Sequence, residues 1–145
     1  MIYMARITKE GRRTLAQFPD CPGCQTFAAP GENVSELAKD ALDGWLEAHL
    51  MYGEAPPPPK ARVPALSRLA VRVNPMLAVR LQLRWARLAL GVSQAELARR
   101  VGVSRQQISL LESPDANLTL ATLEKVARSL GMDLEIELLH TSSEA

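Results

Sequence analysis

The sequence predicts an α+β fold in which short strands and one helix come first and a group of helices follows. Two observations support this prediction. Before the four consecutive prolines at 56–59, three short alternating runs precede one long stretch whose apolar residues have helical spacing. After the prolines, helical spacing dominates, and capping residues and glycines mark several helix ends.

The first part of the chain is predicted to hold a small sheet and a helix. Alternating patterns indicate strands near residues 2–8, 14–18 and 24–28. Asn33, with Glu36 three residues later, is typical of a helix start, and the apolar spacing continues to about Tyr52. Residues 69–73 alternate like the earlier runs, so a fourth strand is expected there. The predicted order is therefore βββαβ.

The second part is predicted to be four helices followed by a strand. The first helix begins at Pro75, where a missing N–H has little effect, and its core face carries Leu77, Leu81, Trp85 and Leu88. Ser93 and Ser104 each open a short helix, with Gly102 at the turn between them. A fourth helix runs from about Thr119 to Leu130. Asp133 to Leu139 alternates acidic and apolar residues, which indicates a strand with one apolar face.

These patterns predict two small domains joined by a proline-rich linker. We place the first domain at residues 1–55, the linker at 56–65, and the second domain with its C-terminal strand at 74–139. A strand within residues 66–73 would return to complete the first domain. Residues 140–145 are expected to form a polar tail.

The charge distribution is uneven, although the 145 residues carry a formal net charge of only +1. Residues 1–59 hold 5 basic and 8 acidic side chains, residues 60–105 hold 10 basic and 1 acidic, and residues 106–145 hold 2 basic and 7 acidic. A basic middle segment is typical of a face that binds a polyanion, and equally of a solvated, arginine-rich helix surface. The charge pattern alone leaves both interpretations open.

Composition excludes several classes of protein. No apolar run approaches the ~18 residues of a membrane helix, and the N-terminal residues lack the pattern of a secretion signal, so a cytoplasmic protein is expected. Two cysteines cannot build a disulfide framework. With 47% apolar and 23% charged residues, the chain has the composition of an ordinary globular protein.

The two short helices and their glycine turn have the arrangement of a helix-turn-helix, whose second helix enters the major groove of DNA. On a helical wheel, Ile108 and Leu111 face the core, and Gln106, Ser109 and Leu110 point outward. Glutamine can pair with adenine, leucine can touch a thymine methyl group, and arginine can reach guanine or phosphate. We therefore predict a DNA-binding surface formed by Gln94, Arg105, Gln106, Ser109, Leu110, Ser93, Arg84 and Arg99, with Arg80, Arg87 and Arg100 adding positive charge around it.

Residues 93–109 resemble the Cro/repressor-type helix-turn-helix family, and residues 122–131 resemble its closing helix. The resemblance implies operator recognition in the major groove, with Gln94, Arg105, Gln106 and Ser109 in the DNA-contacting positions. Helical units of this kind that serve only as interaction modules are the alternative.

We also expect two or more copies of the chain to assemble, because operator half-sites mirror the two-fold axis of a protein dimer. The expected assembly is a homodimer, or a tetramer if the first domain adds a second interface. The strand at 134–138 and the fourth helix are the candidate contacts, and the sequence does not choose between them.

Residues 1–55 resemble the HicB antitoxin family in the first hairpin, in the turn Phe18-Pro19-Asp20-Cys21-Pro22-Gly23 and in the helix that carries Trp45. That family joins a partial ribonuclease-H-like βββαβ domain to a DNA-binding domain. The resemblance implies an antitoxin that neutralises a HicA-like mRNA interferase toxin, a small basic protein, and represses its own operon. An acidic first domain suits such a partner. Toxin contacts are expected within residues 1–55, with the turn residues Phe18, Pro19, Asp20 and Gly23 as candidates.

Two other functions remain compatible with parts of the sequence. A free-standing helix-turn-helix regulator would use its first domain to sense a small ligand. A thiol oxidoreductase would use Cys21 and Cys24, but no predicted helix begins there to lower a thiol pKa.

Catalysis and metal binding are not expected. The predicted strands hold no carboxylates for a two-metal nuclease, and Asp40, Asp43 and Glu47 have the spacing of a solvated helix face. His49 and His140 lie in distant segments and do not complete a zinc site with the two cysteines. We therefore expect no enzyme activity, no metal and no cofactor.

Overall fold

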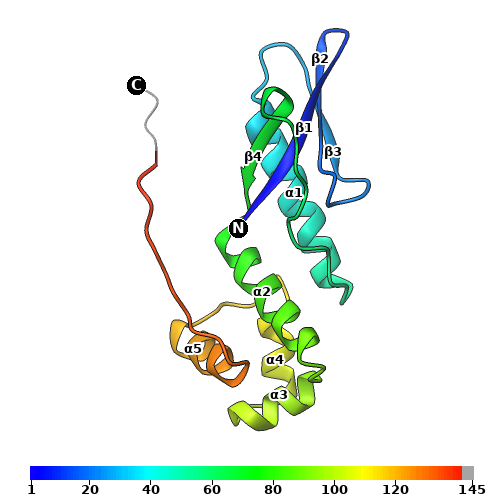
Figure 1. Cartoon of the computed structure of the whole chain (residues 1–145). Coiled ribbons are helices and arrows are strands. Elements are labelled where there is room, and N and C mark those ends of the chain that lie inside the picture. The colour runs from blue at the N-terminus through cyan, green and yellow to red at the C-terminus, as the bar shows by residue number, and fades with distance from the viewer. Residues whose placement is uncertain (142–145) are drawn as a thin grey trace.

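The computed structural model describes residues 1–141 and joins an antiparallel sheet to a group of helices (Figure 1). The sheet and its helix are formed by β1 (Ile2–Glu10), β2 (Arg13–Gln17), β3 (Gln25–Ala28), α1 (Val34–Met51) and β4 (Arg68–Arg72). The helices that follow are α2 (Pro75–Ala89), α3 (Gln94–Val101), α4 (Arg105–Leu111) and α5 (Leu120–Ser129). The α+β class is confirmed, and each element through α5 lies within a few residues of its predicted position.

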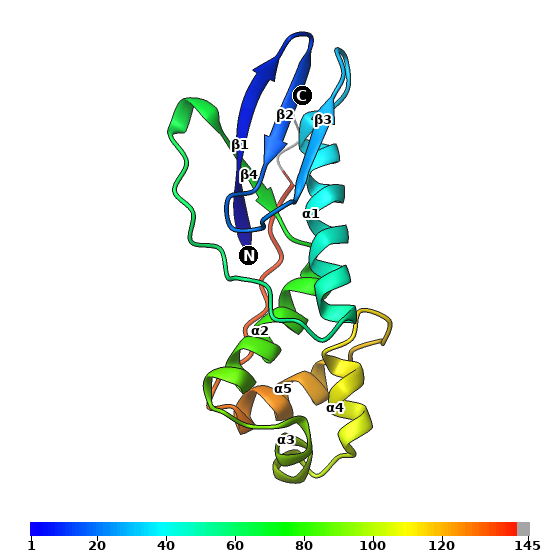
Figure 2. The same ribbon diagram turned by 90° about the vertical axis from the view of Figure 1, so that its right-hand side faces the viewer.

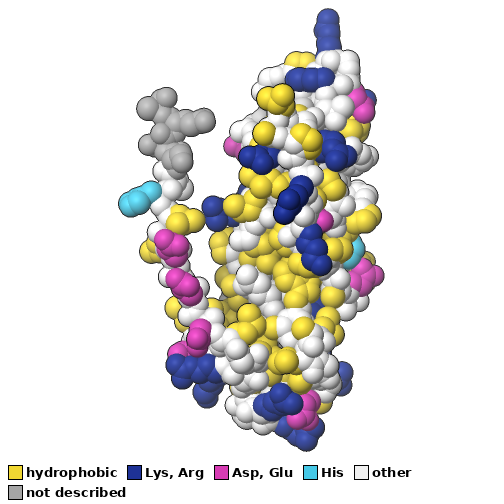
Figure 3. All heavy atoms as spheres, in the orientation of Figure 1, with side chains coloured by type: hydrophobic (Ala, Val, Ile, Leu, Met, Phe, Trp, Pro, Cys, Tyr) yellow, Lys and Arg dark blue, Asp and Glu magenta, His cyan; other side chains and the backbone are white. Residues whose placement is uncertain are grey.

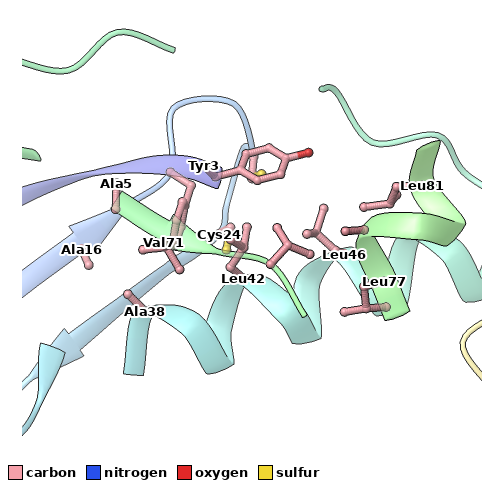
Figure 4. Close-up of a cluster of buried hydrophobic side chains, with 14 of the residues drawn as sticks. Tyr3, Ala5, Ala16, Cys24, Ala38, Leu42, Leu46, Val71, Leu77 and Leu81 are labelled. Atoms are coloured by element: carbon pink, nitrogen blue, oxygen red, sulfur yellow. The ribbon is translucent and has the colours of Figure 1, made fainter. Parts of the chain in front are cut away.

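The four strands have the order β3-β2-β1-β4, and every neighbouring pair is antiparallel. Alternate residues of β1 turn their side chains toward α1, so Tyr3 and Ala5 are buried between the sheet and this helix. Figure 4 shows Leu42 and Leu46 of α1 lying beneath them. α1 covers one face of the sheet, and no helix of residues 1–141 covers the other.

Helix α2 contributes to both hydrophobic clusters of the molecule. Leu77 and Leu81 pack into the cluster under the sheet, next to Leu46 (Figure 4). Leu83 belongs instead to a second cluster, formed with α3, α4 and α5. α2 therefore lies between the sheet unit and the remaining helices and packs against both (Figure 1).

The proline-rich segment was predicted to be a spacer between domains, and the structure corrects this. It runs from the end of α1 back along the sheet to η1 (Ala65–Ser67) and β4, so it connects two elements of the same unit (Figure 2). Pro56 is buried, and its carbonyl accepts a hydrogen bond from Trp85 Nε1 at 2.8 Å. The Pro57 carbonyl accepts another from the Tyr3 hydroxyl at 2.7 Å. The segment is extended, as prolines require, but it is held against the body of the protein.

The Pro-bounded turn after β2 fixes the other end of this segment. An aspartate in a tight turn commonly bonds to its own backbone, but Asp20 Oδ2 accepts hydrogen bonds from the backbone N–H groups of Lys60 and Ala61, at 2.9 and 2.7 Å. The turn residue Phe18 is buried in the first cluster. The turn therefore has a structural role that its local sequence did not reveal.

Two further expectations about the second unit were wrong. Residues 133–139 form no strand: they leave α5 in an extended path and pair with no strand of residues 1–141 (Figure 1). A strand needs a hydrogen-bonded partner, and no strand of residues 1–141 pairs with that segment. Leu88 was placed in the core but is exposed, because α2 turns arginines toward the interior there. Of the predicted polar tail, residues 142–145 lie outside the described residues.

The bonds from Asp20 predict a specific loss of stability. Asp20→Ala removes the acceptor of two backbone N–H groups, so we expect the free energy of unfolding to fall by about 1–3 kcal/mol. Urea denaturation measures the change. Asp40→Ala is the control, because Asp40 is exposed on α1 and makes no hydrogen bond within residues 1–141. Equal effects of the two substitutions would contradict the structural role of Asp20.

Candidate nucleic-acid interface

Helices α3 and α4 are each capped by a serine and are joined by a short turn. Ser93 Oγ accepts the N–H of Glu96 at 3.1 Å and opens α3. Gly102 ends α3 with a φ of 80°, a conformation that favours glycine, and lets the chain turn sharply. Ser104 and Gln107 form a full capping box that opens α4. The predicted helix-turn-helix is therefore present.

Four of the predicted DNA-contacting residues surround one shallow surface hollow. Gln94 from the start of α3 and Arg105, Gln106 and Ser109 from α4 line it. Ile108 and Leu111 face the core, as the helical wheel predicted. The hollow has amide, hydroxyl and guanidinium groups on its walls, which are the groups that hydrogen-bond to base edges and phosphates.

The remaining predicted contacts are spread around this hollow. Leu110 is exposed but lines a separate hollow between α4 and residues 116–122. Ser93 uses its hydroxyl to cap α3. Arg99 is exposed beside the interface and forms an ion pair with Glu96, which also pairs with Arg100.

Arg84, predicted to contact phosphate, is instead buried, as are Arg80 and Arg87. All three lie on one face of α2 and point into the protein, so none of them adds to the charge at the surface. Their helical spacing places these arginines beside the apolar stripe of α2, but it does not show the partners that hold them inside the protein. For Arg84 and Arg87 the partner is Glu112, the residue that follows α4, whereas Arg80 donates to backbone carbonyls, among them those of Leu110 and Leu111.

Glu112 is fully buried and receives hydrogen bonds from three side chains. Arg87 binds both carboxylate oxygens, at 2.5 and 3.0 Å. Arg84 Nε and Gln94 Nε2 bind Oε2, each at 3.2 Å. We call Glu112, Arg84, Arg87 and Gln94 the Glu112 cluster. Burial alone would raise the pKa of Glu112, but its hydrogen bonds and the positive charges of Arg87 and Arg84 outweigh burial and lower it.

The Glu112 cluster ties α4 to the rest of the protein. Arg84 also donates to the Glu112 carbonyl just after α4 and to the carbonyls of Leu50 and Glu54 at the end of α1. Arg80 donates to the carbonyls of Leu110 and Leu111, at 3.0 and 3.2 Å, which end α4. Arginines of α2 therefore satisfy the last carbonyl groups of the helix that carries Gln106.

The part of the chain that contains α3 and α4 is similar to known proteins. A family model described as helix-turn-helix matches residues 83–136. An uncharacterized HTH-type transcriptional regulator of Methanothermobacter thermautotrophicus is 42% identical over 55 residues, which make up 38% of this chain and 80% of that protein. This chain belongs to the helix-turn-helix family of transcriptional regulators.

One solved structure also matches the regulator. It is described as a HicA3 and HicB3 toxin-antitoxin complex, and the matched chain is 28% identical, with a TM-score of 0.44. The match covers 52% of the regulator and 100% of that chain. A TM-score of this size does not establish a common fold.

The turn residues expected to contact a toxin divide into two groups in the regulator. Phe18 is buried and Asp20 is bonded to the proline-rich segment, so both serve the fold. Pro19 and Gly23 are exposed, and Gly23 has a φ of 84°. Of the four candidate residues, Pro19 and Gly23 are therefore the two that are available to a partner without rearrangement.

Cys21 and Cys24 are buried in the first hydrophobic cluster of the regulator. Burial is the main cause that raises the pKa of Cys21 to about 12 and that of Cys24 to about 11. Thiols with such values are protonated at neutral pH and are poor nucleophiles, which argues against a redox role.

Residues 1–141 of the regulator contain no group of three His, Cys, Asp or Glu side chains placed to hold a metal ion. No helix in the same range is long and apolar enough to cross a membrane.

The Glu112 cluster predicts a large and pH-dependent contribution to stability. Glu112→Gln leaves two buried guanidinium groups without their counter-charge, so we expect the free energy of unfolding at pH 7 to fall by about 3–5 kcal/mol. Because folding lowers the pKa of Glu112, its contribution is fully present above the unfolded value of about 4.3 and is lost as the pH falls through the folded value.

Urea denaturation at several pH values tests both parts of this prediction. The stability of Glu112→Gln should depend less on pH below 4.3 than that of the parent chain. Glu124→Gln is the control, because Glu124 forms a surface ion pair with Arg128, and such pairs contribute about 0–1 kcal/mol. A loss below 1 kcal/mol for Glu112→Gln would contradict the structural role of the cluster.

Proposed function

We propose that the regulator is an antitoxin that represses its own operon by binding operator DNA as a dimer and neutralises a HicA-like mRNA interferase toxin. The hollow lined by Gln94, Arg105, Gln106 and Ser109 is the observation that carries the DNA-binding part. The sequence resemblance of residues 1–55 to the HicB antitoxins carries the toxin-binding part.

The side chains of α4 support base reading in the major groove. Gln106 is exposed on the outer face of α4, where its amide can donate to and accept from adenine. Arg105, at the first position of α4, can reach guanine or phosphate, and it forms no ion pair within residues 1–141. Gln94 has a second role here, because its amide donates to Glu112 and so holds its own position beside α4.

The rigid support of α4 favours specific readout of sequence. Discrimination between bases requires that side chains be held within a fraction of an ångström of their partners. Arg80 and Arg84 hold the end of α4, and the capping box of Ser104 and Gln107 holds its start. Such a helix presents Gln106 and Ser109 in one orientation.

The charges of the first unit support a basic protein partner on α1. Glu36, Asp40 and Glu47 are spaced four and seven residues apart, so they share the exposed side of α1, and they form no ion pair within residues 1–141. The uncovered face of the sheet carries arginines instead, including Arg6 and Arg13. A basic toxin would therefore meet complementary charge on α1 and repulsion on the sheet.

The proposal gives this chain no catalytic step of its own. β2, β3 and β4 carry no acidic residues, and the only one in β1 is Glu10 at its end. Converging carboxylates, which a two-metal nuclease requires, are therefore missing from the described strands.

Substitution of Gln106 tests operator binding. Gln106→Ala removes an amide that reads a base edge, so we expect specific affinity to fall by about 1–3 kcal/mol and preference at one base position to relax. Titration of operator variants by fluorescence anisotropy at fixed salt measures both effects. Gln25→Ala, a change of the same side chain on the sheet, is the control and should leave affinity unchanged. Unchanged affinity for Gln106→Ala would contradict base reading by α4.

Toxin neutralisation is tested with the full chain. Co-expression should relieve growth arrest caused by a HicA-like interferase, and Gln106→Ala should relieve it equally well, because the two functions use different surfaces. Glu36→Lys combined with Asp40→Lys and Glu47→Lys should slow association with the toxin at least tenfold at low salt. Glu124→Lys, on α5, is the control. Failure of the parent chain to bind any such toxin would favour a regulator that senses a small ligand.

A further inference from the structure

Within residues 1–141, neither the outer edge of β4 nor residues 133–139 pair with another strand. β4 lies at one edge of the sheet and pairs only with β1. Along the C-terminal segment, the last backbone hydrogen bond of the described chain joins Met132 N–H to the Ala127 carbonyl. An unpaired sheet edge can accept another strand, and an extended segment whose backbone N–H and C=O groups are unpaired can supply that strand.

The register of β4 shows which of its backbone groups are available. Val73 N–H donates to the Met1 carbonyl at 3.1 Å, and the same register places Val71 opposite Tyr3. In an antiparallel ladder every second residue bonds to the same neighbour, so Leu69 and Val71 turn their backbone groups toward β1. Arg68, Ala70 and Arg72 therefore turn theirs outward, and the Arg72 carbonyl is already bonded to Lys39 Nζ at 3.3 Å.

The side chains of β4 and of the C-terminal segment have complementary patterns. Leu69 and Val71 face α1, whereas Arg68 and Arg72 are exposed on the open face and form no ion pair within residues 1–141. The C-terminal segment alternates apolar and acidic residues, with Ile136 and Leu138 exposed: Asp133, Leu134, Glu135, Ile136, Glu137 and Leu138. If the C-terminal segment pairs with β4 so that its acidic residues lie beside Arg68 and Arg72, its apolar residues lie beside Leu69 and Val71.

We propose that residues 133–138 of one copy pair antiparallel with β4 of a second copy and form a fifth strand of its sheet. Asp133 and Glu137 are four residues apart, as are Arg68 and Arg72, so one register brings both acids opposite both arginines. Figure 3 shows basic side chains over the sheet and acidic side chains along the separate C-terminal segment. A one-residue slip would bury the acids and expose the leucines, so the pattern specifies the register.

A second copy of the chain is the proposed partner, because within residues 1–141 of one copy the C-terminal segment forms no backbone hydrogen bond with β4. The bond from Met132 N–H to the Ala127 carbonyl fixes the start of the segment beside α5, and Leu134, half-buried in a hollow between α2 and α5, would leave that hollow to enter the fifth strand. From that point the segment runs on the β4 side of the molecule without bonding to β4 (Figures 1 and 2). In a two-fold dimer, the C-terminal segment of each copy pairs with β4 of the other copy, so both proposed contacts are made and the assembly stops at two copies.

This inference rests on the two-copy state in the proposed function, and it does not depend on the operator or the toxin. Analytical ultracentrifugation of the full chain tests it. Arg68→Glu with Arg72→Glu, or Asp133→Arg with Glu137→Arg, should each weaken the dimer at least tenfold, because opposite charges across strands become like charges. Combining all four substitutions should restore the dimer to within about threefold of the parent. Arg12→Glu with Arg128→Glu changes net charge equally at distant sites and should have no effect.

Hydrogen exchange provides a second measurement that does not require a substitution. The outward amides of Arg68 and Ala70 should gain protection as protein concentration rises through the dimer range, whereas those of Leu69 and Val71 should be protected at all concentrations. Far-UV circular dichroism establishes that each variant is folded.

Three results would overturn the inference. The first is a chain that stays monomeric at every concentration. The second is a dimer that the arginine substitutions leave unchanged but the acidic substitutions alter, which would indicate that two C-terminal segments pair with each other. The third is outward amides of β4 that exchange equally fast at all concentrations. In the last two cases the parent chain can still bind operator DNA, so failure of this inference is distinguishable from failure of the proposed function.

Discussion

The architecture depends on one buried carboxylate, that of Glu112, which must be paired with positive charge. A carboxylate without partners in the interior is so unfavourable that it must be paired, and Arg87, Arg84 and Gln94 provide the pairing. Two of these partners lie on α2 and one on α3, while Glu112 itself follows α4. Satisfying this single group therefore fixes the positions of α3 and α4, which carry the DNA-binding surface, relative to α2.

The same arginines join the sheet unit to the helix-turn-helix. Arg84 reaches from Glu112 to the carbonyls of Leu50 and Glu54 at the end of α1, and Leu77 and Leu81 extend α2 into the cluster under the sheet. Trp85 adds a bond to the proline-rich segment. A partner bound to α1 and DNA bound to α4 would thus contact parts of one continuous packed structure, connected through α2.

Most of the secondary structure could be predicted because its signals are local. Asn33, Ser93, Ser104 and Thr119 cap helices where the sequence placed them, and Gly102 ends α3. The outward position of Gln106 and Ser109 follows from the helical period alone. The arginines of α2 were misassigned because their partner lies 25 or more residues away, and a helical wheel has no information about distant charges. The same limit applies to Asp20, whose partners are 40 and 41 residues away.

The sequence by itself determined the order of the elements, the helix-turn-helix and the residues at its outer face, because caps, turns and periodicity act over a few residues. Only the tertiary structure decided which arginines are interior and which face solvent. Arg84 and Arg87 are interior because folding brings the Glu112 carboxylate, distant in sequence, next to them. It also decided that the prolines lie against the sheet instead of separating two domains. Residues 133–139 carry the pattern of a strand, but a strand is completed only by a neighbour, and one chain does not provide it.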